Sequence, residues 1–293
     1  MRILLLGKNG QLGWELQRTL PFVGEVVALD KEEVDLVDTD TLREVLGASS
    51  WDVIVNASAY TAVDRAEVET EVARKINADA PRVMAEEARK RNAVFIHFST
   101  DYVFDGLKEE PYEETDIPNP GGVYGKTKLE GEQAVQEIGG SYFIFRTSWV
   151  YSMRGDNFVT KVIKWSHQKK ELRVVTDQIA CPTWSRALAE LTSHALSRMK
   201  NMGKDWMLNH RGLYHLASMD YASRYDLACY VVQRLGLPVG VKSALTQEFP
   251  SSVNRPMFSA LSSSCFSRVF DVRVPGWREM LELALESLPK SSL

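Results

Sequence analysis

A glycine-spaced turn near the start of the chain constrains the fold more than any other feature. The apolar run at residues 3–6 is typical of a buried parallel strand, and residues 14–20 have a helical pattern. Between them lie Gly7, Gly10 and Gly13, with two residues in each gap. Glycine permits a tight turn at Gly7, an open backbone at Gly10 and close helix–strand packing at Gly13. This order predicts a dinucleotide phosphate site at the helix N-terminus, with a merely tight turn as the alternative.

Apolar runs and helical patterns alternate along the rest of the first half. Further strands are expected at 26–29, 53–55, 94–98 and 142–145, and further helices at 42–46, in two stretches of 67–91 divided near Pro81, and at 123–138. The prolines and glycines of residues 105–121 predict a long loop. Such alternation builds a parallel sheet with helices on both faces. We therefore expect an α/β protein with a Rossmann-type, doubly wound parallel sheet.

The strand and helix patterns weaken after Trp149, and aromatic residues become frequent. This change predicts a second unit of structure. We expect residues 1–149 to form an NAD(P)-binding Rossmann domain. Residues 150–293 are expected to form mainly a smaller α/β lobe that binds substrate, with some of their segments returning to the Rossmann domain.

Composition argues against several kinds of partner. The formal net charge of the 293 residues is −4 and the basic residues are scattered, so nothing points to nucleic acid or to an anionic membrane surface. No apolar stretch approaches the roughly 20 residues of a membrane-spanning helix, and the run at 3–6 is too short for a secretory signal. Cys181, Cys229 and Cys265 offer neither a disulfide framework nor metal-ligand spacing, so we expect a cytoplasmic protein.

An acidic residue, Asp30, ends the second expected strand. In a Rossmann domain this position accepts hydrogen bonds from the hydroxyls of the adenosine ribose. Its charge would repel a 2′-phosphate and favours NADH, whereas Lys8 and Lys31 lie near in sequence and would favour NADPH. We expect NADH or NADPH as cofactor. A solvated strand end is the alternative for Asp30.

A tyrosine and a lysine four residues apart, Tyr124 and Lys128, lie on the expected helix at 123–138. This spacing stacks the two side chains on one face of a helix. A phenol has a pKa of about 10, and a neighbouring ammonium lowers it. The tyrosine is then suited to protonate a carbonyl oxygen. Ser99 and Thr100 end the preceding strand, where catalytic groups of an open α/β sheet gather; chance spacing on a solvated helix face is the alternative.

Six segments resemble one known family. They are GKNGQLG at 7–13, NASAYTAVD at 56–64, FSTDYVFDG at 98–106, YGKTK at 124–128, FRTSWVY at 145–151 and the pair RP at 255–256. Together they resemble the dTDP-4-dehydrorhamnose reductase family, a branch of the extended short-chain dehydrogenases/reductases, over nearly the whole chain. The resemblance implies NAD(P)H-dependent reduction of the C4 keto group of dTDP-4-dehydro-β-L-rhamnose.

The resemblance also implies roles for individual residues. Tyr124 would donate the proton, Lys128 would tune it and hold the nicotinamide ribose, and Thr100 would polarise the C4 carbonyl. The residues implied around the cofactor are Gly7, Gly10, Gln11, Leu12, Gly13, Asp30, Asp35, Leu36, Ala59, Tyr60, Thr61, Phe98, Tyr124 and Lys128. Those implied at the dTDP-sugar substrate are Thr100, Asp101, Tyr124, Trp149 and Arg255. For Trp149, an ordinary core tryptophan is the alternative.

One departure concerns a metal. Some members of the family bind Mg²⁺ at a dimer interface through glutamates. Glu15 matches one of them, but Arg186 stands where another is expected, and an arginine cannot ligate a cation. Glu190 and Glu286 are interpreted as solvated helix residues rather than substitutes. We therefore expect no metal site, and a monomer or a weak homodimer.

Two other functions remain open from the sequence. An epimerase or dehydratase on a nucleotide sugar uses the same fold and the same tyrosine–lysine pair, although Tyr102 stands where many dehydratases have glutamate. The family also resembles the non-catalytic regulatory subunit of some methionine adenosyltransferases. Retention of Thr100, Tyr124 and Lys128 argues for chemistry.

Overall fold

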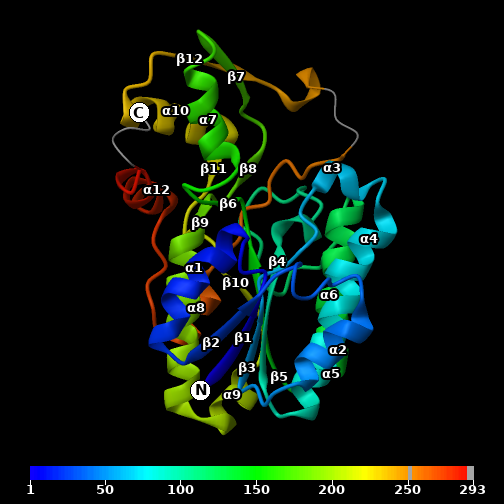
Figure 1. Cartoon of the computed structure of the whole chain (residues 1–293). Coiled ribbons are helices and arrows are strands. Elements are labelled where there is room, and N and C mark those ends of the chain that lie inside the picture. The colour runs from blue at the N-terminus through cyan, green and yellow to red at the C-terminus, as the bar shows by residue number, and fades with distance from the viewer. Residues whose placement is uncertain (250–252, 289–293) are drawn as a thin grey trace.

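The core of the protein is a sheet of six parallel strands in the order β10-β5-β4-β3-β1-β2 (Figure 1). The computed structural model describes residues 1–249 and 253–288, so the end of the lobe expected at 150–293 lies outside the described residues. The strands are β1 (Arg2–Leu6), β2 (Glu25–Leu29), β3 (Val53–Asn56), β4 (Val94–Thr100), β5 (Ser141–Thr147) and β10 (Gly212–His215). The chain leaves β1 toward β2 on one side and continues to β3 on the other, so the expected doubly wound sheet is confirmed.

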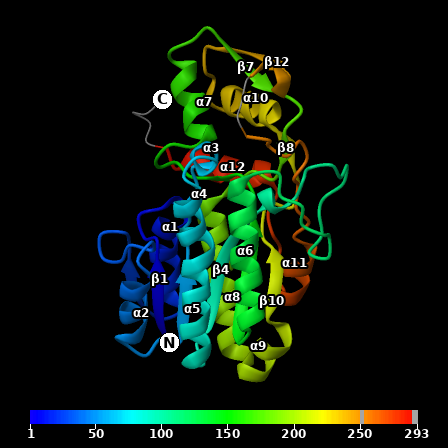
Figure 2. The ribbon, with the colours of Figure 1, turned by 90° about the vertical axis from the view of Figure 1, so that its right-hand side faces the viewer.

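Helices cover both faces of this sheet because successive side chains of each strand point to opposite sides. One face packs against α1 (Gln11–Thr19), α8 (Ser185–Met202), α9 (Lys204–His210) and α11 (Ser264–Phe270). The other face packs against α2 (Thr39–Gly47), α5 (Ala80–Lys90) and α6 (Val123–Ile138). Figure 2 shows α5 and α6 lying side by side on this second face.

The segment between β3 and β4 differs from the expectation of two helical stretches divided near Pro81. The interruption lies at 67–69, between α3 (Val63–Ala66) and α4 (Thr70–Arg74). The helix then continues through a π-helical turn, Lys75–Asp79, directly into α5. Pro81 directly follows this turn, whose last bond runs from the Ala80 N–H to the Lys75 carbonyl, and the wider π turn accommodates a residue without an N–H, so the proline does not divide the helix.

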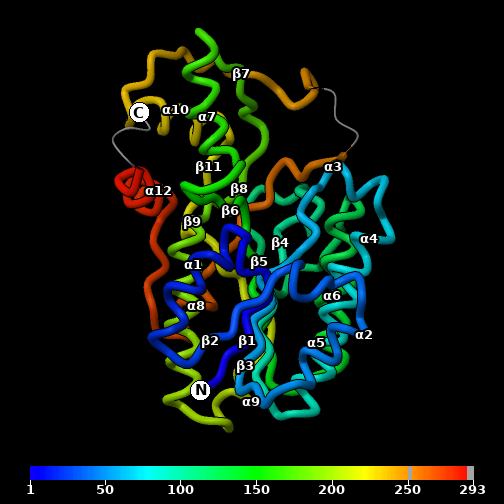
Figure 3. The backbone as a smooth tube through the Cα atoms, in the orientation of Figure 1, coloured from blue at the N-terminus to red at the C-terminus, as the bar shows by residue number. Residues whose placement is uncertain are grey.

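The second half of the chain contributes to both parts of the molecule. Strand β10 extends the sheet beside β5, and α8 packs against α1. The remaining elements form a lobe beyond the carboxyl ends of the strands (Figures 1 and 3). They are α7 (Phe158–Ser166), α10 (Arg224–Leu235), α12 (Trp277–Glu286), and the strand pairs β7 (Glu171–Val175) with β12 (Gly240–Ala244), β6 (Val150–Tyr151) with β9 (Thr183–Trp184), and β8 (Ile179–Ala180) with β11 (Ala222–Ser223).

Short 3₁₀ turns complete the described elements: η1 (Leu20–Phe22), η3 (Asp101–Val103) and η4 (Thr246–Glu248). Turn η3 follows β4 directly and therefore lies where the sheet meets the lobe. Among the described helices, none combines the length and the apolar character needed to cross a membrane.

Candidate active site

A pocket of about 780 Å³ lies between the carboxyl ends of the strands and the lobe. The ends of β1, β2, β3 and β4 contribute to it, together with the start of α6 and of α10. All the cofactor residues expected from the sequence line this pocket except Gly13 and Tyr60, and all the expected substrate residues line it except Arg255. Residues expected from separate motifs are therefore brought to one cavity.

Glycine is present for a different structural reason at each of the three positions of the first turn. Gly7 has a φ of +87°, and a Cβ on it would lie 2.6 Å from the Ser58 hydroxyl oxygen. A Cβ on Gly13 would lie 1.9 Å from the Gly7 carbonyl oxygen, so Gly13 serves packing and does not border the pocket. Gly10, the N-cap of α1, has no neighbour closer than 3.4 Å to a built Cβ. The fold itself does not require glycine there, and its bare backbone faces the pocket.

Asp30 lies at the rim of the pocket after β2. Its carboxylate accepts the backbone N–H of Asn9 and that of Lys31, each at 2.7 Å. The two lysines that could favour a 2′-phosphate are both paired: Lys8 with Glu33, and Lys31 with Asp35 at 3.6 Å. The charges of Lys8 and Lys31 are therefore balanced by Glu33 and Asp35, and Asp30 adds a negative charge at this rim.

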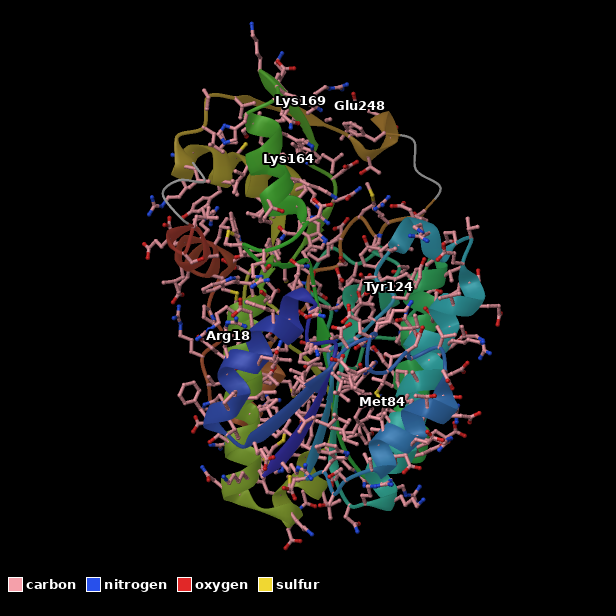
Figure 4. The ribbon with its side chains drawn as sticks, in the orientation of Figure 1. Arg18, Met84, Tyr124, Lys164, Lys169 and Glu248 are labelled. Atoms are coloured by element: carbon pink, nitrogen blue, oxygen red, sulfur yellow. The ribbon has the colours of Figure 1, made fainter. Side chains whose placement is uncertain are left out.

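Tyr124 lies at the start of α6, next to the lobe (Figure 4). Thr100 lies close to its phenol in the same pocket. Burial raises the pKa of Tyr124 well above its usual value, and this outweighs the Thr100 contact, which lowers the pKa. The sequence predicted the opposite shift, through Lys128. The phenol is consequently fully protonated at neutral pH.

Lys128 is buried one helical turn further along α6. Its Nζ donates a hydrogen bond to the Phe98 carbonyl oxygen at 2.6 Å and lies 3.3 Å from Nε2 of His97. Burial lowers the pKa of Lys128 to about 8, against the opposing effect of Glu132. Nζ is directed at the Phe98 carbonyl of β4, and burial rather than Lys128 decides the direction in which the pKa of Tyr124 shifts.

Asp101 lines the pocket, but its carboxylate is already engaged. It accepts hydrogen bonds from the hydroxyls of Ser259 at 2.6 Å, Ser148 at 2.9 Å and Thr100 at 3.1 Å. Burial raises the pKa of Asp101, and these hydroxyls oppose the rise. The Thr100 hydroxyl therefore donates to Asp101, while its oxygen accepts the backbone N–H of Tyr102 at 3.2 Å.

Trp149 and Arg224 form the lobe side of the pocket. Trp149 has a φ of +40°, an unusual backbone conformation for a bulky residue. The Arg224 guanidinium carbon lies 3.6 Å from the centroid of the Trp149 ring and 4.8 Å from that of Phe158. Burial lowers the pKa of Arg224 to about 10. Arg224 has no carboxylate partner within 4.0 Å among the described residues.

Sequence reasoning did not identify Arg224. The local sequence does mark the start of a helix, because Ser223 and Asp226 form a capping box around it. Nothing in the sequence indicates that the first residue of this helix faces a pocket whose other walls come from β4 and α6. That depends on how the lobe packs on the sheet.

Two expected site residues point elsewhere. The hydroxyl of Tyr60 donates to Glu69 at 2.5 Å, and its backbone N–H donates to Asn77, so the ring lies outside the pocket. Arg255 pairs with Asp64 at 2.8 Å and lies near Tyr102, which lines the pocket and whose pKa Arg255 lowers. Arg255 therefore lies one residue away from the cavity wall.

The acidic residues considered for a metal are neutralised by arginines. Arg186 lies between Glu190, at 2.6 Å, and Glu15, at 3.5 Å. Glu286 lies elsewhere, on α12, 3.9 Å from Arg234. The positive charge between Glu15 and Glu190 is therefore supplied by the side chain of Arg186.

Comparisons with known proteins identify the family of this chain. The family model described as "RmlD substrate binding domain" matches residues 1–289. The dTDP-4-dehydrorhamnose reductase of Burkholderia thailandensis is 38% identical, covering 98% of this chain and 99% of that protein. Solved structures of reductases from Clostridium acetobutylicum (34% identical) and, in complex with NADP, from Bacillus anthracis (32%) each superpose with a TM-score of 0.90 over 98% of this chain and 99% of theirs. The chain therefore belongs to the dTDP-4-dehydrorhamnose reductase family.

Proposed function

We propose that this protein reduces the C4 keto group of dTDP-4-dehydro-β-L-rhamnose to give dTDP-L-rhamnose, with NADH or NADPH as the reductant. The observation that carries the proposal is that Thr100, Tyr124 and Lys128 line one pocket with Gly7 and Gly10 of the first turn. A protonated phenol beside a second hydroxyl is the arrangement that carbonyl reduction requires.

The residues of the pocket fit a nicotinamide dinucleotide. The open backbone at Gly10, at the N-terminus of α1, suits the pyrophosphate, and Asp30 suits the adenosine ribose. Apolar residues such as Leu36 and Phe98 line the same wall. When bound, the dinucleotide supplies the hydride. The bare Gly10 backbone is the feature that the fold alone does not explain, which supports a ligand at this position.

Tyr124 supplies the proton in this proposal. Because its pKa is raised, it carries a hydrogen at neutral pH and acts as an acid rather than as a base. As C4 gains an electron pair, its oxygen becomes basic and takes the phenolic hydrogen. Thr100 lines the same pocket and lowers the pKa of Tyr124, so it favours release of the phenolic hydrogen. Lys128 lines the pocket and holds the nicotinamide ribose in this proposal.

Trp149 and Arg224 hold the sugar nucleotide. Its diphosphate is anionic, and Arg224 is a partly buried cation at the lobe side of the pocket. Asp101 takes a different part from the one first expected: it orients the Thr100 hydroxyl instead of binding sugar. We also propose residues 1–149, with β10, α8, α9 and α11 added, as the cofactor domain, and the remaining described part of 150–288 as the substrate lobe.

The proposal extends to the conditions of the reaction. The Arg186 guanidinium between Glu15 and Glu190 supports a reaction without Mg²⁺, in a monomer or a weak homodimer. The three cysteines Cys181, Cys229 and Cys265 are all free thiols, which supports a reducing compartment such as the cytoplasm.

The test is oxidation of NADH and NADPH, followed optically, with enzymatically generated dTDP-4-dehydrorhamnose. The proposal expects stoichiometric, substrate-dependent loss of one or both reduced cofactors and formation of dTDP-rhamnose. Turnover of the nucleotide sugar without net consumption of reductant would instead identify an epimerase or dehydratase. No turnover, together with recovery of a stoichiometric partner enzyme, would identify a regulatory subunit.

A further inference from the structure

The helix that carries Tyr124 begins without a capping side chain of its own. The residue before α6 is Gly122, which has an extended backbone (φ −140°, ψ 170°) and no side chain that could accept an N–H of the first turn. Tyr124 is the second residue of that turn. Because the first N–H groups of a helix have no partners within the helix, the groups that bind them influence where Tyr124 lies.

A carboxylate from another part of the chain supplies the missing acceptor. Oε1 of Glu67 accepts the backbone N–H of Val123, the first residue of α6, at 2.8 Å. A negative charge at this end of a helix also interacts favourably with the helix dipole. Glu67 lies in the interruption between α3 and α4, and α3 contacts α6 (Figure 1). The interruption therefore brings an acidic side chain to the start of α6.

Gly122 is fitted to this carboxylate. A Cβ built on Gly122 would lie 2.8 Å from Oε1 of Glu67, and its next contact, with a methyl group of Val253, would be at 3.7 Å. The φ of Gly122 is negative, in a region that residues other than glycine also adopt, so the backbone conformation does not require glycine. A larger residue at this position would displace the Glu67 carboxylate.

We propose that Glu67 is a positioning residue whose carboxylate fixes the first turn of α6 and thereby orients the Tyr124 phenol in the pocket. The inference rests on the proposed role of Tyr124 as proton donor. The segment that leads from β3 to Glu67 lines the pocket at residues 57–59, 61 and 63. The hydrogen bond from Val123 to Glu67 thus ties this wall of the pocket to the helix that carries Tyr124.

The remainder of α6 is held by other contacts. One turn further along, the Thr127 hydroxyl oxygen accepts a hydrogen bond from the buried side chain of Asn77 at 3.1 Å. A Cβ on Gly131 would lie 2.1 Å from the Asn77 carbonyl oxygen, so α6 packs closely on the π turn there. Lys128 lies between these two contacts in the sequence. Loss of the carboxylate cap should therefore disturb the first turn and leave Lys128 in place.

The first measurement is hydrogen exchange of the Val123 amide, by NMR of the full-length protein labelled with ¹⁵N-valine and without substrate. The signal is assigned by its loss in Val123→Ile. We expect exchange about tenfold faster in Glu67→Ala, the effect of one hydrogen bond to a charged group. Glu67→Gln keeps an accepting oxygen and should stay near wild type, as should Glu130→Ala, at an exposed position on the same helix. Equal exchange in wild type and Glu67→Ala would overturn the inference.

The second measurement links the cap to turnover. In Glu67→Ala we expect kcat to fall about tenfold, with the KM of the cofactor and of the sugar nucleotide unchanged, and most of kcat retained in Glu67→Gln. Glu67 is partly exposed and lines a smaller cavity of about 170 Å³, so water can enter the space it leaves and the variant should fold. Faster exchange with an unchanged kcat would show that the cap does not orient Tyr124.

A double-mutant cycle tests the fit between the two side chains. Gly122→Ala should lower kcat in the otherwise unchanged protein, because its methyl group displaces the Glu67 carboxylate. The same change should lower kcat much less in Glu67→Ala, where the cap is already lost. Residues in direct contact show such non-additive effects. Equal effects of Gly122→Ala in both backgrounds would contradict the inference.

The two proposals can fail separately. The exchange measurement needs no turnover, so an inactive wild-type protein whose Val123 amide is protected by Glu67 would remove the proposed reaction. An active protein in which Glu67→Ala changes neither the exchange of the Val123 amide nor kcat would remove the positioning role alone.

Discussion

The guanidinium carbon of Arg224 lies 3.6 Å from the centroid of the Trp149 ring, and both residues border the pocket that contains Tyr124. Trp149 follows β5, whereas Arg224 begins α10 in the lobe. The stacked pair is therefore a contact between the sheet and the lobe as well as a wall of the site. A cation held flat against an aromatic ring keeps its N–H groups available for a ligand at its edge.

Replacing Arg224 by Gln should weaken binding of the sugar nucleotide. A hydrogen bond to a charged group contributes about 1.5–3 kcal/mol, so the KM of the dTDP-sugar should rise about 10- to 100-fold while the KM of the cofactor stays the same. Steady-state kinetics with each substrate varied in turn measure both values. Arg278→Gln is the control, because Arg278 is exposed and stacks on Trp277 of the lobe. An unchanged KM for the sugar nucleotide in Arg224→Gln would rule out this role.

Tyr124→Phe removes the proton donor and keeps the ring. General acid catalysis contributes about 10²–10⁴-fold, so kcat should fall by that factor while the dissociation constant of the cofactor changes little. Rapid kinetics and a fluorescence titration with NADH measure the two quantities. Tyr142 lies near the start of β5 and does not line the pocket, so Tyr142→Phe should behave as wild type. A Tyr124→Phe variant with wild-type kcat would mean that another group protonates the sugar.

Asp30→Ser should change the choice of cofactor. The carboxylate repels a 2′-phosphate, and its removal takes away a negative charge at the rim while Lys8 and Lys31 stay paired with Glu33 and Asp35. The ratio of kcat/KM for NADH to that for NADPH should fall about tenfold, which corresponds to about 1.4 kcal/mol. Asp205→Ser, at the exposed start of α9, is the control. If the ratio in Asp30→Ser equals the wild-type ratio, Asp30 does not contact the ribose.

Stability should fall in mild acid because of a buried histidine. Burial and the nearby Arg146 lower the pKa of His215 to about 3, and its Nδ1 lies 3.0 Å from the Tyr112 carbonyl oxygen. Below the unfolded value of about 6.5 the unfolded chain takes up a proton that the folded ring refuses, so the free energy of unfolding decreases as the pH falls from about 6.5 toward 3. His97 acts in the same direction.

His215→Asn keeps a donor for the Tyr112 carbonyl and removes this titration. Urea unfolding at pH 7, 6 and 5 should show a shallower loss of stability in the variant, by up to about 1.4 kcal/mol per pH unit. The slope against pH is compared, because the smaller side chain also lowers stability at every pH. His167→Asn, at an exposed position, should keep the wild-type slope. A wild-type slope in His215→Asn would mean that His215 is not the titrating group.

Activity should not depend on Mg²⁺, because the Arg186 guanidinium occupies the space between Glu15 and Glu190. Neither EDTA nor added Mg²⁺ should change kcat, and sedimentation velocity should give the same mass with both. Arg186→Glu places a third acid in this group and should bring Mg²⁺ binding detectable by calorimetry. Loss of wild-type activity in EDTA would show that a metal acts elsewhere in the protein.

Much of the cofactor half could be predicted because its features are local in sequence. The turn from Gly7 to Gly13 needs only neighbouring residues, and the helix bounds 123–138 follow from a pattern of four helical turns. The predicted division of the helix near Pro81 was wrong, and the reason is also local. A π turn lets Pro81 enter a helix that proline usually interrupts.

The sequence by itself determined the strand–turn–helix start, the Rossmann-type sheet and the shared helix face of Tyr124 and Lys128, because each depends on spacing along a few turns or strands. Tertiary structure alone decided which groups surround them. It directed Tyr60 to Glu69, brought Arg224 to the pocket, and raised the pKa of Tyr124. The physical reason is desolvation and side-chain direction: both depend on atoms from β4, α6 and α10 that are far apart in the chain and meet only when the lobe packs on the sheet.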